Sequence, residues 1–211
     1  TLHFYQPFGD FVMNILLASK YDDYLEHLLA LDEDDRYFRF CSVLSDEAIE
    51  NYVGQISSTD VIIAQYNENL KIIGAVQLIF YKNAKNERVA DFGISVLKES
   101  RGNGLAKKLL ERAINYAKNH GVEKMCTLCL VTNRRMQHLA RNSGLTVQES
   151  EEGKQALLEL DSPNSVSIAE EVFAEYIGIC ELKNKELSNF TANMFEKLMY
   201  PMRLFKHLDA E

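Results

Sequence analysis

A strand, a long amphipathic helix and a second strand, in that order, constrain the fold more than any other segment. Residues 89–96 are rich in β-branched and apolar residues, and the apolar side chains of residues 105–117 then recur at helical spacing. Gly121 is placed to end this helix, and residues 124–131 are apolar again. Two strands joined by a helix run parallel in one sheet. The chain therefore predicts an α/β (α+β) fold.

Further apolar runs extend this sheet on both sides. Turn residues separate the runs at 61–65, 72–81 and 89–96, which predicts a three-stranded meander, and residues 11–18 are strand-like. Residues 145–148 and 156–160 predict a closing hairpin. Helices are predicted after a cap at Asp22 or Asp23, after Ser45, and from Asn133 to Gly144.

Composition excludes several classes of protein and function. The chain has 211 residues, 46% hydrophobic and 26% charged, which are globular values rather than those of a disordered or collagen-like chain. A net charge of −8 argues against nucleic acid as a partner. No run approaches the roughly 18 apolar residues of a membrane span, and four cysteines do not form a disulfide framework. We expect a cytoplasmic protein without a membrane partner, in which Cys126 and Cys129 are buried thiols.

The chain is predicted to contain two parts. Residues 1–161 hold the α/β pattern, whereas residues 162–211 hold two amphipathic stripes, with Pro201 separating a short tail. We expect the second part to be a helical extension. Its apolar stripes would cover the core or a second subunit, so a homodimer through the C-terminal helices is possible.

The loop at residues 101–106, Arg-Gly-Asn-Gly-Leu-Ala, has the sequence of a binding site for an anion. It lies between a strand and a helix, where two glycines and the free N–H groups of the helix start form a cradle for an anion. Arg101, Lys107 and Lys108 add positive charge beside it. The loop is not a P-loop, and Lys107 stands where a dinucleotide-binding loop has its third glycine or alanine.

The pattern Arg-x-x-Gly-x-Ala resembles the acyl-CoA motif of the GNAT N-acetyltransferases, and the order of elements over about residues 11–160 is also similar to that superfamily. Segments 35–40, 90–92 and 133–140 resemble the catalytic domain of bacterial Pat-type protein lysine acetyltransferases. The resemblance implies a mixed, centrally splayed sheet of six to seven strands flanked by helices. It also implies an enzyme that transfers acetyl from acetyl-CoA to a primary amine, without a covalent intermediate and without a metal.

The resemblance also implies the site residues. Backbone groups of the strand would hold the pantetheine arm, with the Val96 N–H supporting the oxyanion. Asp91 would act as the general base, in place of the family's Glu. The expected cofactor-binding residues are Ile94, Ser95, Val96, Leu97, Arg101, Gly102, Asn103, Gly104, Leu105, Ala106, Lys107 and Asn133.

Two readings stay open at this point. Many family members have a tyrosine that acts as the general acid at the position of Ala140, so the chain could instead be a non-catalytic acyl-CoA-binding or interaction module.

The distribution of charged residues along the chain favours two separate binding sites. Residues 98–135 hold nine Lys or Arg against three Glu, whereas residues 22–60 hold eleven Asp or Glu against two Arg. We expect a cationic pocket for the cofactor and an acidic approach for a cationic amine, either a small molecule or a protein lysine.

Overall fold

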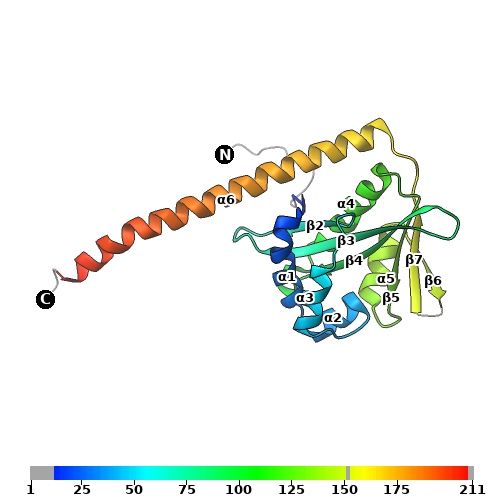
Figure 1. Ribbon diagram of the computed structural model, residues 1–211, viewed down its shortest axis with the longest axis horizontal. Coiled ribbons are helices and arrows are strands. Elements are labelled where there is room, and N and C mark those ends of the chain that lie inside the picture. The colour runs from blue at the N-terminus through cyan, green and yellow to red at the C-terminus, as the bar shows by residue number, and fades with distance from the viewer. Residues whose placement is uncertain (1–11, 151–152, 209–211) are drawn as a thin grey trace.

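A seven-stranded sheet with the order β1-β2-β3-β4-β5-β7-β6 organises the structure, a computed structural model that describes residues 12–150 and 153–208 (Figure 1). The meander β2 to β4 and the hairpin β6–β7 are antiparallel, and β4 pairs in parallel with β5, as the strand–helix–strand pattern predicts. The strands are β1 (Asn14–Ile15), β2 (Val61–Tyr66), β3 (Ile72–Lys82), β4 (Arg88–Val96), β5 (Lys124–Cys129), β6 (Thr146–Ser150) and β7 (Gly153–Glu159).

Helices cover both faces of this sheet (Figure 1). One core lies under α4 and α5 and includes Leu105, Leu109 and Phe92, and the other lies under α1 and α3 and includes Leu28 and Ile49. None of the described helices is long and apolar enough to cross a membrane. The helices are α1 (Tyr21–Leu29), α2 (Glu33–Phe40), α3 (Asp46–Gly54), α4 (Leu105–Asn119), α5 (Arg134–Asn142) and α6 (Ser165–Leu208), with short 3-10 helices η1 (Ala18–Lys20) and η2 (Lys98–Ser100).

The sheet opens between β4 and β5. Their parallel pairing covers only residues 89–91 against 124–126, although β4 continues to Val96 and β5 to Cys129. The Leu97 N–H donates to the Ile73 carbonyl of β3. Because successive residues of a strand turn their backbone groups to opposite sides, the N–H groups of Ile94 and Val96 point to the side that β5 has left. The expected splay is therefore present at the centre of the sheet.

Two local expectations near the N-terminus were wrong, and one helix was not predicted. Strand β1 is only two residues long in place of 11–18, because Asn14 and Ile15 pair with the edge of β2 before the chain turns into η1; residue 11 lies outside the described part. Helix α1 starts at Tyr21, so Asp22 and Asp23 lie in its first turn and do not cap it. Helix α2 was not expected; it follows Asp32, whose carboxylate accepts from the Asp35 N–H at 2.9 Å.

The C-terminal extension is one helix, α6, which extends well beyond the sheet (Figure 1). It continues through Pro201, which was expected to separate a tail, because a proline removes one backbone hydrogen bond while the neighbouring turns keep theirs. The residues of α6 that face the core include Ser167, Glu171 and Gly178. The apolar stripes do not cover the core: Val166, Val172, Phe173, Tyr176, Ile179, Leu187, Phe190 and Met194 are exposed.

Candidate active site

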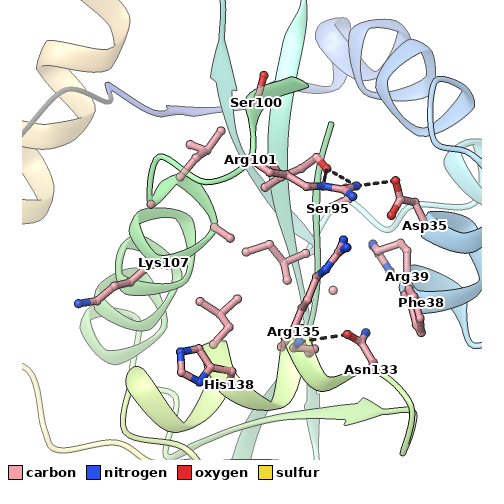
Figure 2. Close-up of a pocket in the computed structure, with 18 of the residues that line it drawn as sticks. Asp35, Phe38, Arg39, Ser95, Ser100, Arg101, Lys107, Asn133, Arg135 and His138 are labelled. Atoms are coloured by element: carbon pink, nitrogen blue, oxygen red, sulfur yellow. Dashed lines mark hydrogen bonds and ion pairs between the residues drawn. The ribbon is translucent and has the colours of Figure 1, made fainter. Parts of the chain in front are cut away.

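A cavity of about 670 Å³ lies where β4 and β5 diverge (Figure 2). Its wall is formed by residues of α2, of the N-terminus of α4 and the loop before it, of α5, and of the diverging ends of β4 and β5. The structure brings eleven of the twelve expected cofactor-binding residues into its wall: Ile94, Ser95, Val96, Arg101, Gly102, Asn103, Gly104, Leu105, Ala106, Lys107 and Asn133.

The remaining residue, Leu97, does not line the cavity. Its N–H is used by the Ile73 carbonyl (3.0 Å), and its side chain packs against the core under α1. It is therefore turned away from any ligand that follows the open edge of β4. Ile94 and Val96, by contrast, present their N–H groups to the opening.

The glycine loop has the geometry of an anion cradle. Gly102 and Gly104 have φ values of 85° and 87°, a region where an L residue with a side chain is strained. A Cβ at either position would meet no atom within 4 Å, so the backbone angle alone requires glycine there. The Asn103 side chain accepts from the Leu105 N–H at 3.1 Å and orders the turn. The start of α4 thus presents N–H groups and the positive end of the helix dipole to the cavity.

Arg101 does not add free charge to this cradle, contrary to expectation. Its guanidinium donates to the Val96 carbonyl at 2.9 and 2.8 Å and forms an ion pair with Asp35 of α2 (Figure 2). The bonds arise because the loop folds back over the end of β4, where the Val96 carbonyl has no β5 partner. Arg101 therefore fixes α2 to β4 and shapes the cavity.

Asp91 occupies the last paired position before β4 and β5 separate, opposite Cys126. It shares a strand face with Gly93 and Ser95, as the alternation predicts, but it does not line the cavity. One carboxylate oxygen accepts from the N–H of the next residue, Phe92, at 2.8 Å. Burial raises the pKa of Asp91, while this hydrogen bond and the charge of Arg39 act in the opposite direction. A carboxylate with a raised pKa at this fork is suited to accept a proton through water.

Ser95 is held by a buried histidine. Its Oγ lies 2.8 Å from Nε2 of His27, whose Nδ1 lies 3.0 Å from the Ile72 carbonyl. A carbonyl can only accept, so Nδ1 bears the proton and Nε2 accepts from the serine hydroxyl. Burial lowers the pKa of His27 to about 4, which keeps the imidazole neutral. This pair anchors α1 to the strand that lines the cavity.

Helix α5 supplies a further part of the cavity wall. Asn133 caps it, its Oδ1 accepting from the Met136 N–H at 3.0 Å, so its amide nitrogen stays available to a ligand. Ala140, at the position of the family's tyrosine acid, is fully buried in the core. Arg135 lies on the cavity side of this helix, and no carboxylate of the described residues forms an ion pair with it (Figure 2).

Arg39 is one of the lining residues that were not predicted as site residues. The sequence of segment 35–40 predicts Tyr37, Phe38 and Phe40 as core residues, with Arg36 and Arg39 as solvated or ion-paired neighbours. Arg36 does pair with Asp46, but Tyr37 is exposed. The Arg39 guanidinium lies against Gly93 of β4, because a glycine at that point leaves room for it. The signal that could have found it is that glycine in the middle of a strand, which marks a close approach.

The fold and the site together define an enzyme that transfers an acyl group from a CoA ester: a sheet splayed at its centre, with an anion cradle where the crossover helix begins. A protein-family model described as the Acetyltransferase (GNAT) family matches residues 12–145. The match covers more than half of the chain, so the chain belongs to the GNAT acetyltransferase family and is an N-acetyltransferase by class. It confirms the family that the loop motif indicated.

Solved structures show the same fold at low sequence identity. The GNAT domain of S. lividans PAT is 16% identical, with a TM-score of 0.60 over 70% of this chain and 89% of that chain. Spermidine N-acetyltransferase from Vibrio cholerae, in complex with CoA and spermine, is 20% identical (TM-score 0.56; 70% and 95% covered). RimL, a ribosomal L7/L12 alpha-N-protein acetyltransferase in complex with CoA, is 16% identical (TM-score 0.55; 74% and 98% covered). The similarity to Pat is therefore one of fold.

Proposed function

We propose that the protein transfers an acetyl group from acetyl-CoA directly to a primary amine, with polyamines and protein amines as acceptor classes. The observation that carries this proposal is the glycine cradle at the open end of β4, which leads straight into the cavity between the splayed strands. The solved structures above that name CoA, spermine and a protein N-terminus support both halves of the reaction.

Different groups of residues would bind the parts of the cofactor and carry out the steps of the reaction. Residues 101–107 would hold the pyrophosphate, the open edge of β4 the pantetheine arm, and the Asn133 amide a further polar group of the cofactor. The Val96 N–H would support the oxyanion, for which one such donor contributes about 3 kcal/mol. Asp91 would take the amine proton through water. A lysine-like amine is mostly charged at neutral pH, and presenting it uncharged costs about 4 kcal/mol.

The cradle is tested by a pair of glycine variants. In Gly104→Ala the new side chain meets no atom within 4 Å, but its φ of 87° is strained. We expect the Kd for acetyl-CoA to rise about 10-fold, measured by calorimetry, because the loop relaxes away from the cradle geometry. Gly54→Ala is the matched control, since it also meets no atom and has no positive φ. Equal affinity in both variants would remove the cradle from the proposal.

The base is tested by Asp91→Asn. We expect acetyl-CoA binding to be kept and kcat to fall at least about 100-fold for amine acceptors, measured as release of free CoA thiol. Because burial raises the Asp91 pKa, the wild-type rate should fall as the pH drops toward that pKa. Full turnover in the variant would show that another group takes the proton. A full panel of polyamines, lysine peptides and N-terminal peptides without thiol release would contradict the transferase reaction.

We also propose that residues 1–161 form the catalytic domain and that residues 162–211 pair two copies of the chain; residues 1–11, 151–152 and 209–211 of these ranges lie outside the described part. Val166, Cys180, Leu187 and Met194 on α6 are exposed and spaced by multiples of seven, the repeat of a coiled coil. Free thiols at all four cysteines support a reducing, cytoplasmic compartment.

Sedimentation velocity of the full chain tests the dimer. Tyr176→Glu combined with Leu187→Glu places charge on the exposed apolar stripe and is expected to convert a dimer into a monomer. Ser188→Glu, on the same stretch but at a polar position, is the control and is expected to leave the dimer intact. A monomeric wild-type chain at all concentrations would refute pairing through α6.

A further inference from the structure

Arg39 brings a positive charge to the cavity wall, and none of the described carboxylates contacts it directly. Its Nη2 donates to three neutral oxygens, on Tyr24 (3.2 Å), Tyr52 (3.4 Å) and Gln77 (3.1 Å). Its Nε is buried without a hydrogen-bond acceptor, and no carboxylate of residues 12–150 or 153–208 forms an ion pair with the guanidinium. Two carboxylates act on it without contact: Asp91, whose pKa is raised by burial while the charge of Arg39 acts in the opposite direction, and Asp60, which accepts from Nε2 of Gln77 at 3.3 Å. A largely buried charge that is hydrogen-bonded only to neutral groups is costly, which is the arrangement expected where a ligand supplies a direct counter-charge.

The surroundings hold this guanidinium in one place. A side chain at Gly93 would collide with Nη1 and Cζ, so the group lies directly on the backbone of β4. The rings of Phe40 and Tyr52 lie 4.8 and 5.9 Å from Cζ. Three oxygens, two rings and one glycine thus position the guanidinium beside the cavity (Figure 2), and its Nη1, which no hydrogen bond among the described residues uses, is left to donate to another molecule.

The place of Arg39 separates it from the phosphate cradle. Gly93 is three residues before Val96, about 10 Å along the strand from the end that leads into the glycine loop. A CoA ester with its phosphates in that loop and its pantetheine arm along β4 would bring its acyl group, and the amine that attacks it, toward Gly93. Arg39 therefore serves the reacting end of the cavity, not the nucleotide end.

Charge in the cavity differs from the acidic approach that the composition of residues 22–60 suggested. The lining residues include Arg39, Arg101, Lys107 and Arg135 but a single carboxylate, Asp35, and that carboxylate is bound by Arg101. Other acids of this stretch are engaged outside the cavity, such as Asp46 with Arg36 and Glu26 with Lys71. The reacting end is therefore suited to a group with negative charge.

We propose that Arg39 binds a carboxylate of the substrate, carried by the acyl group of the CoA ester or by the amine acceptor. The inference rests on the proposed function, because it assigns the end of the cavity by the path of the CoA ester. Charge-assisted hydrogen bonding from Nη1 to the carboxylate would supply both orientation and specificity.

Two experimental arms distinguish the sources. In the acyl arm, calorimetry compares the Kd of succinyl-CoA with that of butyryl-CoA, which has a methyl group in place of the carboxylate. In the acceptor arm, with acetyl-CoA as donor, kcat/KM is compared between glycine, β-alanine or 4-aminobutyrate and the corresponding amide. We expect the carboxylate member to be preferred at least about 10-fold in one arm. The arm that shows the preference identifies the carrier of the carboxylate.

Variants at Arg39 and Gly93 test whether the preference for the carboxylate depends on the Arg39 guanidinium. Arg39→Gln is expected to reduce it to about threefold or less, whereas Lys85→Gln, which removes an exposed charge in the β3–β4 turn, should keep it. Gly93→Ala displaces the guanidinium without changing its charge and is expected to reproduce the loss; it replaces Arg39→Gln if circular dichroism shows that the latter does not fold. Acetyl-CoA binding without a preference in either arm, or a preference that survives both variants, overturns the inference. Failure to bind acetyl-CoA overturns the proposed function itself.

Discussion

Lowering the pH from 7 to 5 is expected to destabilise the fold through His27. The imidazole is 2% exposed and satisfied only as the neutral form, donating from Nδ1 to Ile72 and accepting at Nε2 from Ser95. Its pKa is lowered to about 4 in the fold from 6.5 in the unfolded chain. The fold is therefore fully stabilised above pH 6.5 and loses that stabilisation as the pH falls toward 4. The difference of about 2.5 pKa units corresponds to roughly 3 kcal/mol in total, of which about 2 kcal/mol is lost between pH 7 and 5.

Urea unfolding followed by far-UV circular dichroism measures this loss, since the chain has no tryptophan. His27→Gln should be less stable at pH 7 and should lack most of the pH dependence between 7 and 5. His120→Gln, at an exposed histidine that stacks on Tyr116, is the control and should keep the wild-type slope. A wild-type change below about 0.5 kcal/mol over this range, or the same slope in His27→Gln, would refute the argument from burial.

Three further variants test how the site is held in place. Asp35→Asn removes the ion pair that fixes Arg101, and it should lower the free energy of unfolding by about 1–2 kcal/mol in urea titrations. Leu109→Ala empties a fully buried position beneath α4 and should cost about 2–5 kcal/mol in the same assay. Asn133→Ala removes the cap of α5 and should cost about 1 kcal/mol, seen as a lower Tm by circular dichroism.

The parts of the fold that could be predicted from the sequence are those where burial leaves a periodic pattern. Leu105, Leu109 and Ala113 are all buried, so the stripe that predicts α4 is also the face that packs on the sheet. Ser45 caps α3 as predicted, its Oγ accepting from the Ala48 N–H. Helix α2 has no buried residue, so its sequence has no apolar stripe; its capping aspartate, Asp32, was the available signal.

The candidate site could be predicted where its residues are consecutive and not where they are distant. The loop at 101–107 consists of consecutive residues, so the two glycines that form the anion cradle can be recognised as a motif in the sequence. Arg39 acquires its partners from three other elements, with Gln77 lying 38 residues away, so no short pattern contains the cluster. The role of Arg101 was wrong for the same reason, because Asp35 lies 66 residues before it.

The separation of β4 from β5 affects how the two parts of the sheet open locally in the native state. Three residue pairs join a four-stranded part, β1 to β4, to a three-stranded part, β5 to β7, so these parts can act as two units in native-state hydrogen exchange. The amide protons of Ile94 and Val96 lie at the centre of the sheet yet lack a strand partner on their own side, and they should exchange as fast as edge amides. A ligand that binds along this seam, as proposed for the pantetheine arm, would pair with these amides in the way that an additional strand does. At one hundred times its Kd it would stabilise the fold by about 2.7 kcal/mol, so the supply of substrate would set how long the enzyme survives.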